Sequence, residues 1–393
     1  MTFFPFPIRN LSMPFLRSNL LTASCHQRFM RKAILLAQRA TRLVTPNPRV
    51  GAVVVKDSVI IGEGYHKQAG CPHAEVEALR QASEKARGAV LYVTLEPCCT
   101  AGKTPPCTQA VIDAGISEVY VGVIDPNPLH AGNGIEILRR NGISVHCGIL
   151  EKACQTLIED FSKYITLHKP FVIVKTAMSI DGKIATTRGE SKWITSAKSR
   201  IMVQKIRRSV DAIMVGVGTV IADNPHLTIR NASRKYPQPW RIIIDPELSI
   251  PEESNVLTDS FRERTVIITT PNSSLEKKER LSNANVRIIE LDKSGMWYNP
   301  NNILSALADL PVVSVLLEGG SQAIGTFFDA ECIDKCYFFT APKIIGGSSA
   351  PTPVGGSGIS SLDSIVALRD IQWKKCGTDM MLSGYPIWNK QEI

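Results

Sequence analysis

Helix-like and strand-like segments alternate along this chain, and the alternation limits the folds that it can adopt. In the first half, segments 27–40, 73–86 and 108–116 have the apolar spacing of helices. The short apolar runs 89–96 and 118–125 are typical of buried strands. Since buried strands that alternate with helices build α/β folds, we predict an α/β architecture.

A hairpin and a second series of strands complete the pattern. Segment 49–65 is typical of a β-hairpin that turns near Lys56 and Asp57. After Lys169-Pro170 the apolar runs resume, at 171–182, 211–219, 241–245, 264–270 and 313–320. A chain of 393 residues exceeds what one core usually organises, so we expect two domains. The expected parts are an N-terminal extension that could be disordered (1–25), a first domain (26–149), a helical linker (150–169) and a second domain (170–393).

The net charge of +9 comes from the N-terminus. Residues 1–56 hold nine basic and no acidic side chains, and the remaining 337 residues are balanced, with 36 of each sign. Binding to nucleic acid usually needs a basic face on the folded body, so we expect no nucleic-acid partner. The chain has no run of about 18 apolar residues, so we expect no membrane span.

The first 25 residues leave two interpretations open. They carry Arg but no acidic residue, as targeting peptides do. They could equally be a disordered extension or an over-long start, with Met13 as a second initiator. Pro and Arg interrupt the apolar stretches, which argues against a secretory signal. We therefore expect a cytoplasmic protein, or a plastid protein if the source is a plant or alga.

A candidate metal site comes from three residues that are distant in sequence. His73 opens a predicted helix, Cys98 follows the strand-like run 89–96, and Cys107 begins the next helix. Strand ends and helix starts are where α/β sheets present ligands, and a helix N-terminus favours the thiolate that zinc needs. Ten cysteines in so long a chain are not typical of a disulfide scaffold. We predict one Zn²⁺ at these three residues.

The predicted ligand set leaves room for catalysis. One His and two Cys keep the fourth position of zinc free for water, as in catalytic sites. Glu75, two residues after His73, is placed to carry protons between that water and a substrate. Two alternatives are a polar helix start without metal and a zinc site with a purely structural role. The free fourth position and Glu75 favour a catalytic site.

These residues resemble the zinc deaminases, whose signature is H-x-E with P-C-x-x-C. Here the two cysteines are nine residues apart rather than three. That long spacing, with "TPNPRVGAVVV", "TLEPCCTAGKTPPC" and "GVIDPNPLHAGNGIEIL", is similar to the deaminase domain of the bifunctional riboflavin-biosynthesis enzymes. The resemblance implies a cytidine-deaminase-like three-layer domain. It also implies hydrolytic removal of an amine from a diaminopyrimidine that carries a phosphoribosylamino group.

The same resemblance implies a set of substrate contacts. They are Asn47, His66, Lys103, Thr104, Asp125 and Asn127. Asn47, Asp125 and Asn127 could instead be turn formers beside prolines, and His66 could be a packed histidine. The chain departs from the family where it has Cys99-Thr100 in place of Ser-His, which removes one expected contact. We expect Cys99 to stay outside the zinc site, because neighbours on an extended stretch point in opposite directions.

The second half resembles the reductase of the same family, a relative of dihydrofolate reductase. "KTAMSIDGKIA", "GESKWIT", "VGVGTVIADNPHLTIR" and "LLEGGSQAIGTFF" carry the resemblance. It implies an NADPH site at Ala177, Trp193, Thr219, Asp223, Gly320, Ser321, Gln322, Ala323, Ile324, Gly325 and Thr326. It implies substrate contacts at Lys175, Ser191, Arg207, Leu227, Arg230 and Glu318. A strand, two glycines and a helix start also suit a phosphate-bearing cofactor on physical grounds.

The resemblance implies that NADPH reduces the opened ribose to a ribityl chain. Arg207 and Arg230 suit a phosphate, although each could be an ordinary surface cation, and Trp193 could be a core residue. Lys175 and Glu318 are the candidates for acid–base work. We expect a small phosphoribosyl pyrimidine as substrate and a homo-oligomer. A deaminase of nucleic-acid bases is disfavoured, because it predicts short cysteine spacing and a basic second domain.

Overall fold

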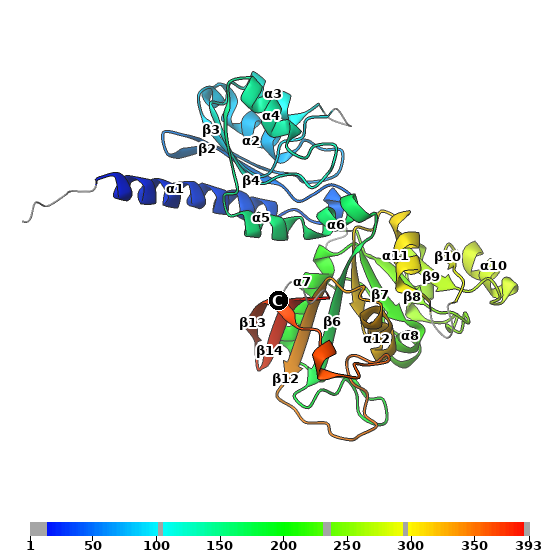
Figure 1. Cartoon of the computed structure of the whole chain (residues 1–393). Coiled ribbons are helices and arrows are strands. Elements are labelled where there is room, and N and C mark those ends of the chain that lie inside the picture. The colour runs from blue at the N-terminus through cyan, green and yellow to red at the C-terminus, as the bar shows by residue number, and fades with distance from the viewer. Residues whose placement is uncertain (1–13, 101–104, 231–236, 294–297, 389–393) are drawn as a thin grey trace, which may run out of the picture. The chain divides into compact units, whose positions relative to one another are not determined.

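The computed structural model describes residues 14–100, 105–230, 237–293 and 298–388. The chain forms two compact units (Figure 1). The first comprises residues up to Ala40 and Pro48–Ile158, and the second comprises Thr41–Asn47 and the residues from Glu159 onward. Within the described residues, no helix is both long and apolar enough to cross a membrane.

The first unit contains a five-stranded sheet in the order β2-β1-β3-β4-β5. The β1–β2 pair is an antiparallel hairpin, which confirms the prediction for segment 49–65. β1 and β3 are also antiparallel, whereas β3, β4 and β5 run parallel. The strands are β1 (Gly51–Lys56), β2 (Val59–Tyr65), β3 (Val90–Leu95), β4 (Glu118–Val123) and β5 (Ser144–Cys147).

Helices cover both faces of this sheet, which gives three layers (Figure 1). The helices are α1 (Pro14–Ala37), α2 (Ala74–Ala82), α3 (Cys107–Asp113), α4 (Asn133–Arg140) and α5 (Glu151–Leu157). Close packing explains two glycines of the sheet: a Cβ on Gly51 would lie 2.1 Å from the carbonyl oxygen of Ala33, and one on Gly64 the same distance from that of Ala74. α1 begins at Pro14, so the boundary expected at residue 25 falls inside a helix.

The second unit contains a nine-stranded sheet in the order β10-β9-β8-β7-β11-β6-β12-β14-β13. The strands from β10 to β12 are parallel, and β14 and β13 add an antiparallel hairpin. They are β6 (Phe171–Ser179), β7 (Ala212–Gly216), β8 (Trp240–Ile244), β9 (Thr265–Thr269), β10 (Arg287–Glu290), β11 (Ser314–Glu318), β12 (Lys335–Ala341), β13 (Leu368–Cys376) and β14 (Asp379–Pro386).

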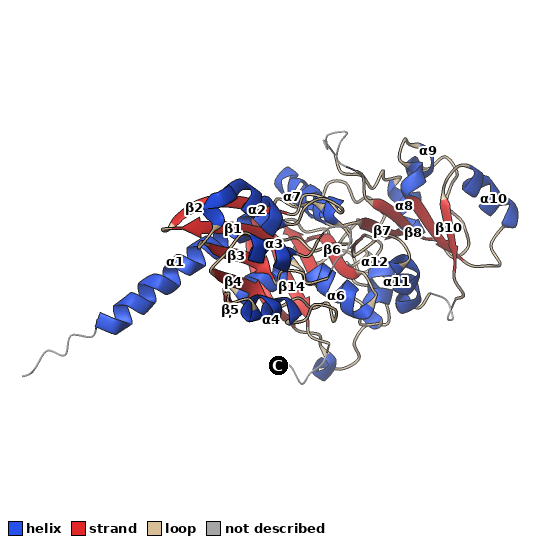
Figure 2. Ribbon diagram, turned by 90° about the horizontal axis from the view of Figure 1, so that it is seen from above, coloured by secondary structure: helices blue, strands red, loops and turns tan. Residues whose placement is uncertain are grey.

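Apolar clusters lie on both faces of this sheet, and helices cover both faces (Figure 2). Side chains of α11 and α12 pack against alternate residues of the central strands, such as Met214, and α8, α9 and α10 pack against their neighbours, such as Ile213. The helices are α6 (Glu159–Leu167), α7 (Ala197–Ser209), α8 (Val217–Asp223), α9 (Asn255–Thr258), α10 (Leu275–Asn283), α11 (Pro300–Ala308) and α12 (Ser321–Asp329). The strand expected at 211–219 ends at Gly216, where α8 begins.

Segment Thr41–Asn47 belongs to the second unit through a buried carboxylate. The Thr45 hydroxyl donates to Asp211 Oδ1 over 2.6 Å. Asp211 Oδ2 accepts from the Val313 and Ser314 N–H groups and from the Ser314 hydroxyl. Burial raises the pKa of Asp211, so these four donors stabilise a charge that the site otherwise disfavours.

Candidate active sites

The three predicted zinc ligands come together in the first unit. His73 precedes α2, Cys98 follows β3, and Cys107 begins α3. Their ligand atoms all lie within 4.8 Å of one another, with His73 Nδ1 3.2 Å from Cys107 Sγ and 3.5 Å from Cys98 Sγ. Two sulfurs and one imidazole nitrogen at such separations fit a tetrahedral zinc ion that keeps its fourth position open.

Electrostatics at this cluster favour a thiolate. The pKa of Cys98 falls to about 4, first because the Cys107 thiol donates to it and then because His73 lies beside it. The Cys107 N–H also points at Cys98 Sγ over 3.4 Å. A thiolate is the form of cysteine that binds zinc, so the donor set fits the ion chemically as well as geometrically.

Glu75 lies in the first turn of α2 and is 3% exposed. Burial raises its pKa to about 7, although the nearby His73 acts in the opposite direction. A carboxyl group in such surroundings changes its protonation near neutral pH, which suits a group that takes up and releases protons.

The loop after β4 places Asp125 and Asn127 in the same unit. Asp125 is buried, and burial raises its pKa to about 6. Its Oδ1 accepts from the Asn127 N–H over 2.8 Å, so the pair also forms the turn that the prolines suggested. Glu96, which the sequence did not single out, binds this loop: its carboxylate accepts from the N–H groups of Asp125, Gly132, Gly134 and Ile135.

The structure describes some of the remaining predicted substrate contacts of the deaminase and not others. His66 is 2% exposed, and its ring lies edge-on to that of His73 with 5.1 Å between centroids; burial lowers its pKa. Asn47 groups with the second unit. Lys103 and Thr104 lie outside the described residues. The Cys99 thiol faces His130, 3.4 Å from its Nδ1.

The second unit holds a cavity of about 650 Å³. It opens at the carboxyl ends of β6, β7, β8 and β11, where open α/β sheets bind ligands. Every predicted reductase residue except Leu227 and Gly325 lines it. Leu227 is buried in the apolar core beneath α8, and Gly325 packs against the chain at Gly355 and Gly356.

A charged cluster lies at the wall of this cavity. Arg207 binds Glu318 through two hydrogen bonds, from Nε over 2.7 Å and from Nη2 over 2.9 Å. Its Nη1 donates to the Thr228 carbonyl. Lys175 Nζ lies 3.2 Å from the same carboxylate. Burial alone would raise the pKa of Glu318, but Arg207 and Lys175 outweigh burial and hold it at about 2. Glu318 is therefore a fixed carboxylate.

The residues at the other wall fit a nucleotide cofactor. Gly319 and Gly320 have positive φ angles of 81° and 76°, and α12 follows directly, so bare backbone and a helix start face the cavity. Among the described residues no side chain caps α12. The buried hydroxyls of Thr176 and Tyr298 line the same cavity and lack partners within the described part of the chain. Both can bind a polar ligand.

Arg200 and Gln204 are among the residues of this cavity that sequence reasoning missed. Both line it from α7, together with Arg207. The i, i+4, i+7 spacing of three polar residues was the available signal, since such residues share one helix face. The Arg200 guanidinium lies over the Trp193 ring, 4.5 Å from its centroid, and Trp193 is 56% exposed. Trp193 is thus no core residue.

Comparison with known families gives two matches along the chain. Residues 23–123 match the model of the cytidine and deoxycytidylate deaminase zinc-binding region. Residues 170–382 match the model of the RibD C-terminal domain. The two matched regions contain the ligand cluster and the cavity respectively.

Whole-length relatives resemble both halves together. The riboflavin biosynthesis protein RibD of Aquifex aeolicus is 44% identical over 90% of this chain and 96% of its own length. That of Bacillus amyloliquefaciens is 43% identical over 91% and 95%. The structure resembles Acinetobacter baumannii RibD (TM-score 0.82, 34% identity, 93% and 99% coverage). It also resembles a Thermotoga maritima diaminohydroxyphosphoribosylaminopyrimidine deaminase/5-amino-6-(5-phosphoribosylamino)uracil reductase (TM-score 0.81, 36% identity, 93% and 100% coverage).

Proposed function

The chain belongs to the RibD family of bifunctional riboflavin-biosynthesis enzymes, and we propose which of its residues carry out each of the two reactions. The enzyme is a zinc-dependent hydrolase and an NADPH-dependent oxidoreductase. It deaminates 2,5-diamino-6-(5-phosphoribosylamino)pyrimidin-4(3H)-one and then reduces the ribosyl group to ribityl. We assign deamination to residues 26–149 and reduction to residues 170–393, joined by the helical segment 150–169.

In the deaminase, His73, Cys98 and Cys107 hold zinc, which when bound supplies Lewis-acid activation of water. Water adds to the ring carbon that bears the amine, the carbon–nitrogen bond breaks, and ammonia leaves. Glu75 accepts the proton that water gives up and returns it to the leaving nitrogen. Asn47, His66, Asp125 and Asn127 bind the pyrimidine and ribose, Lys103 binds the phosphate, and Thr104 is a further substrate contact. The observation that carries this assignment is a buried Glu75 next to an open His-Cys-Cys cluster.

In the reductase, bound NADPH supplies the hydride that the first ribose carbon receives. Lys175 Nζ donates the accompanying proton, because Glu318 is held as a carboxylate and has none to give. Arg230 binds the substrate phosphate: it lines the cavity, whereas Arg207 is already engaged by Glu318 and Thr228. Ser191 is a further substrate contact and lines the cavity, and Leu227, which is buried in the neighbouring apolar core, supports the site without lining it. The cofactor contacts are Ala177, Trp193, Thr219, Asp223 and the α12 start from Gly320 to Thr326, in which Gly325 contributes through its close packing against Gly355 and Gly356 rather than by lining the cavity.

One experiment tests both assignments. With the diaminopyrimidine substrate, ammonia release and NADPH oxidation are followed separately in the same sample. Glu75→Gln should stop ammonia release but leave NADPH oxidation intact when the deaminated intermediate is supplied. Cys98→Ser and Cys107→Ser should lose zinc by elemental analysis, whereas Cys71→Ser should keep it. Full ammonia release by Glu75→Gln would refute the assigned proton transfer.

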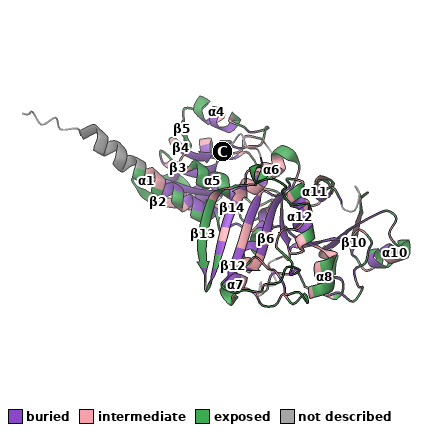
Figure 3. Ribbon diagram, turned by 60° about the horizontal axis from the view of Figure 1, so that its bottom comes forward, coloured by how far each residue is buried: buried purple, intermediate pink, exposed green. Residues whose placement is uncertain are grey.

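We also propose that the enzyme is a cytoplasmic homo-oligomer. The edge strand β13 exposes Ile371 and Trp373, the latter by 64%, and an unpaired edge with apolar side chains can pair with a second copy (Figure 3). Light scattering would test it: a Trp373→Lys variant should shift towards monomer. A reducing compartment suits thiolate ligands. Plastid import has no support, since the relatives above are bacterial.

A further inference from the structure

The loop after α8 links two residues of the reductase cavity. Asp223 ends α8 and lines the cavity, and so does Arg230, but residues 224–229 between them do not. The positions of Asp223 and Arg230 therefore depend on how the intervening backbone is held. The loop contains no regular element, and apart from the Asn224 N–H, which donates to the Val220 carbonyl at the end of α8, neither a strand ladder nor a helix supplies its hydrogen bonds.

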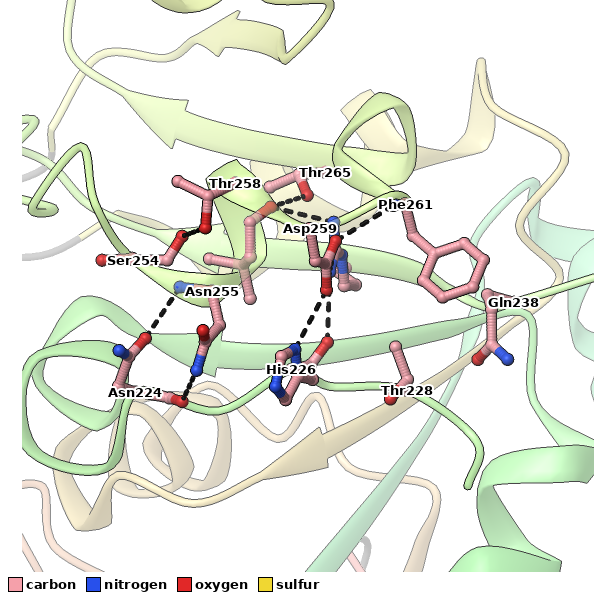
Figure 4. Close-up of polar contacts among 12 residues, drawn as sticks. Asn224, His226, Thr228, Gln238, Ser254, Asn255, Thr258, Asp259, Phe261 and Thr265 are labelled. Carbon is pink, nitrogen blue, oxygen red and sulfur yellow. Dashed lines mark hydrogen bonds and ion pairs between the residues drawn. The ribbon is translucent and has the colours of Figure 1, made fainter. Parts of the chain in front are cut away.

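A buried ion pair between Arg241 and Asp259 holds the middle of this loop at His226; Figure 4 shows Asp259 beside His226. Arg241, on β8, is 0% exposed, and its Nη1 donates to both carboxylate oxygens of Asp259, over 2.9 and 2.8 Å. The same Nη1 reaches the His226 carbonyl at 3.2 Å, and Nη2 donates to the Val256 carbonyl at 2.8 Å. Asp259 in turn lies 3.2 Å from the His226 ring. Arg241 thus joins the loop to α9 and to the segment after it.

Side chains also hold the loop on either side of His226. Asn255 donates from its backbone N–H to Asn224 Oδ1 and from its amide to the Asn224 carbonyl (Figure 4). Gln238 binds both the N–H and the carbonyl of Ile229. The remaining anchors are Arg207 on the Thr228 carbonyl and Gln204 on the Arg230 N–H.

We propose that Arg241 is a positioning residue of the reductase: it fixes the loop 224–229 so that Arg230 meets the substrate phosphate and Asp223 meets the cofactor. The proposal rests on the function proposed above. A guanidinium buried this fully is an expensive way to stabilise a core, since apolar residues of similar volume often stabilise as well or better. What they cannot do is donate to a loop carbonyl. The His226 contact is thus the part of the network that an apolar core could not replace.

An experiment can separate the contact with the loop carbonyl from the contribution of Arg241 to core stability. The double variant Arg241→Met/Asp259→Asn removes both charges, keeps the volume, and leaves no unpaired charge in the core. We expect a KM for the pyrimidine substrate of the reductase raised about tenfold or more, because small displacements of binding groups are costly. We expect kcat to change less than threefold, since Lys175 lies outside the loop, and ammonia release by the same chain to be unchanged. Arg241→Lys should fall between, because a single ammonium nitrogen cannot occupy the positions of both Nη1 and Nη2, from which Arg241 binds these groups.

A matched control comes from the same unit. Lys278 is also a buried cation, paired with Glu290 over 2.8 Å, and neither residue lines the cavity. Lys278→Met/Glu290→Gln should keep the wild-type KM even if its melting temperature falls as far as that of the Arg241 variant. The proposal is refuted if the Arg241 double variant keeps the wild-type KM, or if both double variants raise KM equally. If the wild type itself fails to oxidise NADPH, the proposed function fails instead.

Discussion

Removing the Arg207 side chain tests whether Glu318 is held as a carboxylate. In Arg207→Leu, Lys175 is the charged partner that Glu318 keeps among the residues the structure describes, and Glu318 is 6% exposed. The wild-type pKa of about 2 against an ordinary 4.5 corresponds to about 3 kcal/mol of stability at neutral pH. Removing one partner of a buried ion pair costs about 3–5 kcal/mol, which is of the same size. We therefore expect the second unit to lose about 3 kcal/mol at pH 7.

The sign of the pH dependence makes this prediction specific. A depressed carboxyl pKa contributes stability that is complete above pH 4.5 and is lost as the pH falls towards 2. In the variant, Glu318 is buried with one cation fewer, so its pKa rises. Lowering the pH therefore protonates Glu318 and stabilises the variant, whereas it lowers the stability of the wild type. The stability difference between the two proteins should therefore shrink steadily from pH 7 to pH 3.

Tryptophan fluorescence during urea unfolding measures this difference in the right unit. All five tryptophans lie after residue 170, so the signal reports the second unit. Arg207→Leu/Glu318→Gln is the control, because it removes the buried carboxylate that lost its Arg partner; it should recover part of the lost stability, since Lys175 Nζ then faces a neutral amide instead of a carboxylate. A difference that stays constant between pH 7 and pH 3, or a double variant as unstable as the single one, would show that Glu318 is not held by Arg207.

Three further outcomes follow from individual contacts. Thr45→Val should destabilise the second unit by about 1–3 kcal/mol in the same urea assay, because buried Asp211 loses a 2.6 Å hydrogen bond; Thr45→Ser, which keeps the hydroxyl, serves as the comparison. Gly325→Ala should weaken NADPH binding, measured by fluorescence titration, because its Cβ would lie 2.2 Å from backbone atoms of Gly355 and Gly356. Removal of zinc by a chelator should abolish ammonia release and leave NADPH oxidation of supplied intermediate unchanged, and loss of both activities would contradict two independent sites.

The sequence predicted the zinc cluster and the strands β1–β4, β6–β9 and β11, because these depend on local patterns, whereas β5, β10, β12, β13 and β14 were not predicted. Buried strands and amphipathic helices are visible as periodicity, and a ligand at a strand end or helix start is fixed by its neighbours. The β14–β13 hairpin escaped prediction because β13 is exposed along most of its length, so it lacks the apolar run that marked the central strands. Segment Thr41–Asn47 could not be assigned to the second unit, because its hydrogen bond to Asp211 joins residues that are 166 positions apart.

The role expected for Arg207 shows a second limit. Its residue type suited a phosphate, and it does line the cavity, but its guanidinium binds Glu318 and the Thr228 carbonyl. A sequence shows which charged residues a site contains, but it does not show which of them form ion pairs with one another. The Arg207–Glu318 pair joins α7 to β11, and only the folded sheet brings those elements together.

Glu96 and Arg241 indicate why such pairs recur in this chain. Each is a buried charged side chain that binds the main chain of a loop carrying predicted binding residues: Glu96 accepts from the N–H of Asp125, and Arg241 donates to the carbonyl of His226. Loops at a binding edge leave the hydrogen-bond ladders of the sheet, so their buried backbone groups need other partners. A charged group forms stronger hydrogen bonds than a neutral one, and it costs more to leave unpaired. The charged side chain therefore fixes the conformation of the loop. The binding residues on the loop then have defined positions, although the charged side chain need not contact the substrate.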